Sequence, residues 1–161
     1  MKKSLLISTI AFLGCLIASP AFAQGVKDAG AHAAYKFEAE PHGLVTLFDE
    51  FKPGVGFRGT FVIVDNGFIK TLNNSIGIGA GLDWTQNHFK IPVVMQWNFF
   101  LHQNWSVFGE PGGVIDIGTN GNDTHVRPAF YAGGRWHFAE KITLTMRVGY
   151  PTASVGVSFL L

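Results

Sequence analysis

The sequence predicts an all-β fold, a single antiparallel up-and-down β-barrel of about eight strands. Three observations lead to this prediction. Apolar and polar residues alternate with period two in segment after segment from residue 35 to residue 161, and no helical period occurs there. Short turn-forming stretches separate these segments, and none is long enough to contain a crossover helix. An even number of strands brings both ends of the sheet to one side, as a closed barrel requires.

The first 23 residues are typical of a secretory signal peptide. Lys2 and Lys3 form a basic start, an apolar stretch follows from Leu5 to Ala18, and Ala21-Phe22-Ala23 supplies small residues at the cleavage site. A lipoprotein leader ending at Cys15 is the alternative, which the continuing apolar stretch disfavours. Because Cys15 is the only cysteine, cleavage after residue 23 leaves no thiol for a disulfide.

The composition offers little charge for a surface in water. Hydrophobic residues make up 47% of the 161 residues and charged residues 14%, against roughly 25% charged in soluble proteins. Removing two lysines with the leader leaves 10 basic and 11 acidic residues, a net charge of −1. The sequence contains no run of like charge, so nothing in it indicates a nucleic-acid partner. After the leader no apolar run reaches the roughly 18 residues of a spanning helix, so a membrane crossing would use strands.

A short linker, residues 24–34, precedes the predicted barrel domain, residues 35–161. The eight alternating segments are residues 35–42, 55–64, 76–84, 91–101, 105–117, 126–138, 142–149 and 154–161. The first, second and fifth are less regular: Pro41 predicts a bend in the first, and Val62 and Val64 interrupt the polar face of the second. The third, in which glycines alternate with apolar residues, and the fourth, sixth, seventh and eighth alternate cleanly. The glycine-rich stretch 109–113 predicts a bulge in the fifth.

Alternation alone does not say whether the apolar face meets lipid or a dry core, because soluble barrels alternate too. Here the polar faces consist largely of Gly, Ser and Thr with a few charges, and the apolar faces carry most of the aromatic bulk. An eight-stranded barrel has a narrow interior that small side chains fill. The pattern therefore predicts a transmembrane barrel, with the apolar face outward.

The charges on the polar faces are balanced. The basic side chains are Lys36, Arg58, Arg127, Arg135 and Arg147, and the acidic ones are Glu38, Glu40, Asp83, Glu110 and Asp116. Burying unpaired charge costs several kcal/mol per ion, so an occupied lumen should be close to neutral. Arginine is the usual partner for crowded carboxylates. We expect these ten side chains to form a paired network in the lumen; a solvated face with coincidental balance is the alternative.

Aromatic residues gather toward the two ends of the apolar faces. With the N-terminus on the periplasmic side, one rim holds Tyr35, Phe37, Trp97, Phe99, Trp105, Trp136, Phe138 and Phe159, and the opposite rim holds Phe57, Trp84 and Tyr150. Amphipathic rings favour the headgroup level of a bilayer. Two aromatic belts are therefore predicted.

The last strand resembles the C-terminal assembly signal of bacterial outer-membrane proteins, with Ser154, Gly156, Phe159 and Leu161 in its four defined places. That signal usually ends in Phe or Trp, so Leu161 departs from it. Together with the leader, residues 35–161 are similar in pattern to the small OmpA/OmpX-type eight-stranded barrels of Gram-negative bacteria. The resemblance implies an outer-membrane location and recognition by the barrel-assembly machinery. We expect a monomer in contact with outer-membrane lipid.

No motif for catalysis, metal binding or a cofactor is found. Small outer-membrane barrels that modify lipid A use a His and a Ser at the membrane rim, but no spacing singles out His42, His125, Ser106 or Ser154. The six histidines are scattered without metal-ligand spacing. We therefore expect a structural, non-enzymatic barrel without a cofactor. The alternatives are a rim-acting lipid A-modifying acyl hydrolase or transferase, and a soluble secreted barrel that binds a hydrophobic ligand.

Overall fold

The structure is a computed structural model that describes residues 27–48, 51–119 and 124–161. The predicted signal peptide lies outside the described residues, and the predicted linker is described from residue 27 onward. The strands are β1 (Phe37–Thr46), β2 (Pro53–Val64), β3 (Asn74–Thr85), β4 (His88–His102), β5 (Trp105–Gly118), β6 (Thr124–Ala139), β7 (Ile142–Tyr150) and β8 (Thr152–Leu160).

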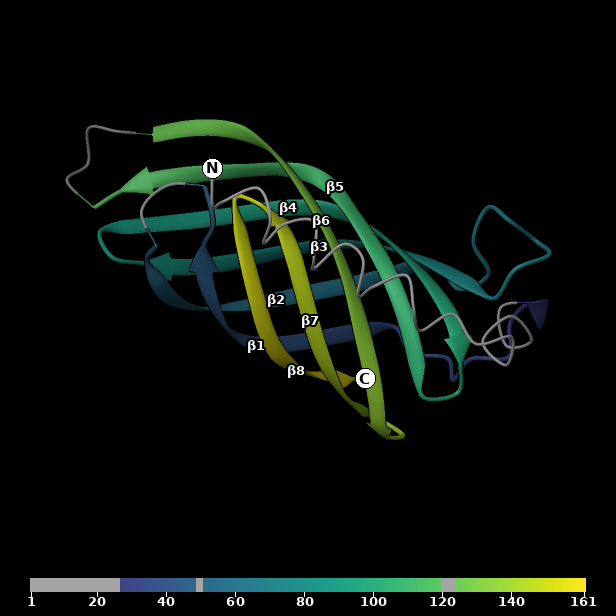
Figure 1. Ribbon diagram of the computed structural model, residues 1–161. Coiled ribbons are helices and arrows are strands. Elements are labelled where there is room, and N and C mark those ends of the chain that lie inside the picture. The colour runs from purple at the N-terminus through teal and green to yellow at the C-terminus, as the bar shows by residue number, and fades with distance from the viewer. Residues whose placement is uncertain (1–26, 49–50, 120–123) are drawn as a thin grey trace, which may run out of the picture.

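The strands form one closed antiparallel barrel in sequence order. Each strand pairs with the next, and β1 pairs with β8, which lie side by side in Figure 1 as the dark-blue and yellow strands. The register between β1 and β8 runs from Glu38 opposite Leu160 to Thr46 opposite Thr152. The predicted eight-stranded up-and-down barrel is confirmed.

Side chains alternate between the lumen and the outer face, as the period-two pattern requires. In β4, for example, Val94, Gln96 and Asn98 are buried, whereas Val93 and Met95 are exposed. The outer face carries large apolar side chains at high exposure, such as Val126 at 77% and Phe61 at 63%. The lumen has the opposite composition: most of the large, fully buried side chains are polar or charged.

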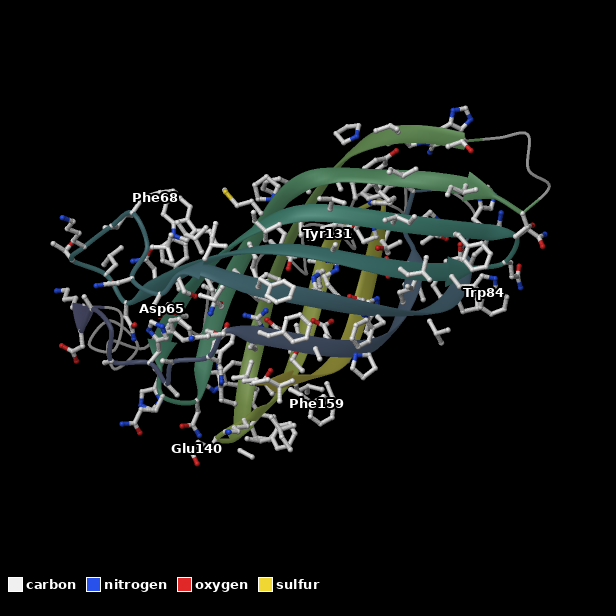
Figure 2. The ribbon with its side chains drawn as sticks, turned by 180° about the vertical axis from the view of Figure 1, so that it is seen from behind. Asp65, Phe68, Trp84, Tyr131, Glu140 and Phe159 are labelled. Atoms are coloured by element: carbon white, nitrogen blue, oxygen red, sulfur yellow. The ribbon has the colours of Figure 1, made fainter. Side chains whose placement is uncertain are left out.

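Two apolar clusters also lie inside the barrel. Val94, Val114, Ala129 and Tyr131 form one of them; Tyr131 lies within the barrel in Figure 2. The other cluster contains Tyr35, Phe100 and Leu160, with Val62 packed against it. Val62 therefore breaks the polar face of β2 because its position faces an apolar cluster inside the lumen.

The irregularities of the sheet are confined to one end of the barrel. Register shifts occur between Val62 and Val64, between Phe100 and His102, and between His137 and Ala139. The predicted bulge at 109–113 is wrong, because β5 pairs with β6 in unbroken register there. Gly112 instead allows a close approach, since a Cβ at this position would collide with the β4 backbone.

The β2–β3 connection packs on the outer face at the same end. The ring of Phe68 meets Trp97 edge-on, with centroids 6.2 Å apart. The Asn74 side chain donates to the carbonyls of Ile69 and Leu72 and accepts from Trp97 Nε1 at 3.0 Å. These contacts cover Ile76, which is 1% exposed although it belongs to the outward-facing set.

Candidate functional site

The lumen contains a group of buried charged side chains that cross it from wall to wall. Arg147 on β7 donates to both oxygens of Glu40 on β1, at 2.7 and 3.0 Å. It also donates to both oxygens of Glu110 on β5, at 2.9 and 3.2 Å, and to Ser154 Oγ at 3.3 Å. All three of its nitrogens are therefore used, as the fork of a guanidinium allows.

The same contacts continue into a closed cycle. Arg58 Nη1 lies 2.7 Å from Glu110 Oε2, and Arg58 Nη2 lies 3.9 Å from Asp83 Oδ2. His42 Nε2 lies 2.9 Å from Asp83 Oδ1, and His42 Nδ1 lies 3.6 Å from Glu40 Oε1. We call the six residues Arg58, Asp83, His42, Glu40, Arg147 and Glu110 the lumen ring. Its members come from five strands, and each is less than 4% exposed at its side chain.

A second ion pair lies beside the lumen ring. Arg135 Nη2 on β6 donates to both oxygens of Glu38 on β1, at 2.8 and 2.7 Å. The ring of Phe108 lies between two guanidinium groups, with its centroid 4.5 Å from Arg135 Cζ and 5.2 Å from Arg147 Cζ. Cation–π attraction therefore adds to the ion pairs, because the ring face carries negative charge density.

His42 was not predicted as part of the network. His42 lies opposite two glycines of the neighbouring strands, Gly56 on β2 and Gly156 on β8. A Cβ at Gly56 would collide with His42 Nε2 and Asp83 Oδ1, and one at Gly156 would lie 2.6 Å from His42 Cβ. Charge counting overlooked it because histidine is neutral in a formal count; its place between two lumen-facing glycines was the available signal.

Three predicted network members lie outside the lumen ring and the Arg135–Glu38 pair. Lys36 is exposed and precedes β1, so alternation was extended one residue too far. Arg127 is half-buried near the start of β6 and takes no part in the lumen ring. Asp116 is buried but pairs with His88 at 2.9 Å, apart from the lumen ring. Lys90, which was not predicted, is 5% exposed and donates to Thr85 Oγ1 at 3.3 Å.

Two outward aromatic residues mark the two ends of the barrel in Figure 2, Trp84 at one end and Phe68 at the other, and the two belts stay a prediction. Residues of the predicted belts make ring contacts with one another or with further aromatics, namely Phe37 with Phe61, Trp97 with Phe99, Trp105 with Trp136, Trp136 with Phe138, and Tyr150 with Phe48. Tyr35 corrects the predicted belt: it is 8% exposed inside the lumen, because it packs on Phe100 and Leu160.

The four residues of the C-terminal signal have separate surroundings in the barrel. Ser154 faces the lumen and accepts from Arg147, and Gly156 borders His42. Phe159 is 41% exposed on the outer face. The backbone N–H of Leu161 donates to Phe37 O at 2.8 Å, which extends the β1–β8 pairing. The structure describes their positions and leaves recognition by an assembly machinery a prediction.

One serine and one histidine meet in the lumen. Ser106 Oγ lies 3.1 Å from His137 Nε2. Ser106 is fully buried, and within the described residues no carboxylate pairs with His137. A nucleophile needs an approach path for its substrate and a group that orients its base. The contact therefore fits a structural hydrogen bond between the buried Ser106 hydroxyl and the half-buried His137 ring.

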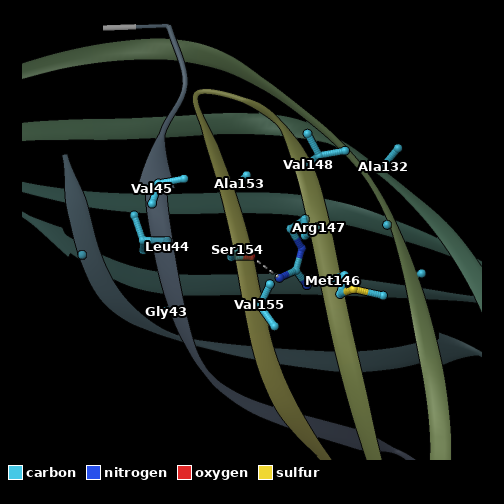
Figure 3. Close-up of a pocket in the computed structure, with 13 residues that line it drawn as sticks. Gly43, Leu44, Val45, Ala132, Met146, Arg147, Val148, Ala153, Ser154 and Val155 are labelled. Atoms are coloured by element: carbon cyan, nitrogen blue, oxygen red, sulfur yellow. Dashed lines mark hydrogen bonds between the residues drawn. The ribbon is translucent and has the colours of Figure 1, made fainter. Parts of the chain in front are cut away.

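An apolar depression lies on the outer face over β1, β6, β7 and β8 (Figure 3). Small residues lower the surface there, namely Gly43, Ala132, Gly134 and Ala153, among larger neighbours such as Met146 and Val155. Arg147 and Ser154, joined by the dashed line in Figure 3, are only 4% and 7% exposed. A molecule in this depression would therefore contact apolar surface, because the Arg147 charge lies beneath it.

The described residues contain neither a helix that could span a membrane nor a cluster of metal-ligating side chains. In that part of the chain, no helix has the length and apolar character needed to cross a membrane. No group of three or more His, Cys, Asp or Glu side chains there is arranged to hold a metal ion.

The chain matches no protein-family model and no curated protein sequence. Among solved structures it is similar to a barrel from a study of the de novo design of transmembrane β-barrels, with a TM-score of 0.59 and 9% identity over 80% of this chain and 98% of the other. It is also similar to the Yersinia pestis outer-membrane protein Ail in a phospholipid bilayer nanodisc, with a TM-score of 0.52 and 9% identity over 80% of this chain and all of Ail. These likenesses show the fold, a closed eight-stranded barrel of the kind that transmembrane proteins use.

Proposed function

We propose that the chain is an integral outer-membrane β-barrel protein with a structural, non-enzymatic role. The observation that carries this proposal is the inverted distribution of side chains. Phe57, Phe61, Phe130 and Val155 are between 48% and 63% exposed on the outer face, whereas charged residues fill the lumen. Exposing so much contiguous apolar surface to water is unfavourable, and a lipid environment removes that cost.

The lumen supports the closed, structural character of the proposed role. The lumen ring joins five strands through buried ion pairs, and the Arg135–Glu38 pair brings in β6. Eight strands leave an interior that side chains fill. We propose that these charges form a polar plug and that the monomer has lipid as its main surroundings and the barrel-assembly machinery as its partner during biogenesis.

The test is folding of the mature chain into phospholipid vesicles, read by electrophoresis without and with boiling. We expect a compact band that migrates differently after boiling, together with recovery of the protein in the outer-membrane fraction of expressing cells. A chain that folds in buffer without lipid or detergent, and is found in the soluble periplasm, would support the soluble barrel instead.

The Ser106–His137 contact is the observation that keeps the lipid A-modifying enzyme testable. Lipid A from cells expressing the protein, the Ser106→Ala variant or neither should have the same acyl pattern under the structural proposal. A change in acylation that requires Ser106 would replace that proposal with the enzymatic one.

A further inference from the structure

The lumen ring has an alternating order of charges. Around the ring the residues are Arg58, Asp83, His42, Glu40, Arg147 and Glu110, so that each carboxylate lies between two nitrogen-bearing groups. Two arginines face three carboxylates. With a neutral imidazole the ring would carry a net charge of −1, and with an imidazolium it is neutral.

The hydrogen-bond geometry of His42 leads to the same charge. Its Nε2 lies 2.9 Å from Asp83 Oδ1, and its Nδ1 lies 3.3 Å from the backbone oxygen of Glu40. A carboxylate and a carbonyl oxygen can only accept. A neutral imidazole donates from one nitrogen and leaves a lone pair on the other, whereas the imidazolium donates from both.

The charged groups around His42 favour the cation. Glu40 lies on the same strand, Asp83 faces it from β3, and β8 contributes the uncharged Gly156. Arg58 on β2 and Arg147 on β7 are the opposing cations, and each is bonded to Glu110.

Two further side chains complete these surroundings. Lys90 on β4 lies opposite Asp83 in register, but its Nζ donates to Thr85. Tyr131 has its ring centroid 5.2 Å from Arg58 Cζ. Among the described residues, the ion pairs of the Asp83 carboxylate are with Arg58 and His42.

We propose that His42 is an imidazolium in the folded barrel at neutral pH and that it is the third cation of the lumen ring. With this proton the lumen ring is electrically neutral, and the assignment rests on the contacts of His42 inside the lumen.

The test is ¹⁵N NMR of the histidine rings in the full mature chain, folded in detergent micelles at neutral pH. In the unsubstituted protein both His42 nitrogens should have the resonances of protonated nitrogens. In Asp83→Asn the ring has two carboxylates and two arginines, so His42 should lose one of its ring protons. Asp116→Asn is the matched control, since Asp116 pairs with His88 outside the ring, and His42 should keep both protons there.

An unprotonated His42 nitrogen in the unsubstituted protein would overturn the proposal, and so would an imidazolium that persists in Asp83→Asn. If Asp83→Asn does not fold, urea unfolding of His42 variants tests the proposal instead. His42→Gln leaves a net negative ring and should unfold at a lower urea concentration, and adding Asp83→Asn to it should restore much of the loss. Unchanged unfolding of His42→Gln would also overturn the assignment.

Discussion

Arg147 and Glu110 meet across the lumen from strands that are not neighbours, with Arg147 Nε 2.9 Å from Glu110 Oε2. Glu110 also receives Arg58 Nη1 at 2.7 Å and Gln96 Nε2 at 2.8 Å. One fully buried carboxylate thus links β2, β4, β5 and β7 through the interior, in addition to the hydrogen bonds of the sheet.

Glu110→Gln should therefore destabilise the barrel strongly. The substitution keeps the shape of the side chain but leaves two buried guanidinium groups short of a counter-charge, which costs about 3 to 5 kcal/mol of unfolding free energy. Urea unfolding in detergent measures the loss. Glu140→Gln, at the exposed β6–β7 turn, is the control and should change stability by less than about 0.5 kcal/mol. Equal stabilities of the two variants would show that the ion pairs contribute little.

The Arg135–Glu38 pair should behave as a self-contained unit. Removing one partner, as in Arg135→Met, leaves a buried unpaired carboxylate and should cost about 3 to 5 kcal/mol. Adding Glu38→Met should recover most of that loss, because two apolar side chains can replace a buried ion pair at little cost. The same urea measurements give the coupling energy. Additive losses would mean that the two residues act independently.

Gly56 should be intolerant of a side chain, since a Cβ there would collide with His42 and Asp83. Gly56→Ala should destabilise the barrel by about 1 to 3 kcal/mol through overpacking. Gly43→Ala is the matched control in β1, because a Cβ at Gly43 meets no atom within 4 Å. Thermal unfolding of both variants in detergent distinguishes them, and a tolerant Gly56 would contradict the close packing around the imidazole.

Tyr35, which precedes β1, should make stability depend on alkaline pH. Burial raises the pKa of the Tyr35 phenol to about 12, from about 10 in the unfolded chain. The neutral phenol is favoured in the fold, so its contribution is complete below pH about 10 and is lost as pH rises to about 12. The loss amounts to about 3 kcal/mol. Tyr35→Phe lacks this titration; parallel pH profiles for the two proteins would contradict the burial of the hydroxyl.

Much of the fold could be predicted because the barrel repeats one simple rule. Period-two alternation identified all eight strands, and it placed Glu38, Arg58 and Arg147 on the inward face without any knowledge of their partners. Alternation failed where tertiary packing overrides it. Tyr35 turns inward ahead of β1, and Ile76 is covered by the β2–β3 connection.

The site was less predictable than the fold, because pairing depends on register and on tilt across the lumen. Counting charges gave a balance of five against five, but Lys36 lies outside the lumen and Arg127 outside the lumen ring. The balancing group, His42, carries no formal charge in such a count. Only the contacts across the interior bring Glu110 between Arg58 and Arg147.

The central claim, that the outer face lies in lipid, can be tested with the four tryptophans of the chain, Trp84, Trp97, Trp105 and Trp136. All four belong to the outward-facing set of the barrel, and three of them are between 38% and 48% exposed. The measurement is tryptophan fluorescence of the folded protein in vesicles whose acyl chains carry bromine, compared with unbrominated vesicles. Strong quenching by the brominated chains, with little effect of aqueous iodide, is the predicted result. Full emission in brominated vesicles together with quenching by iodide would contradict it.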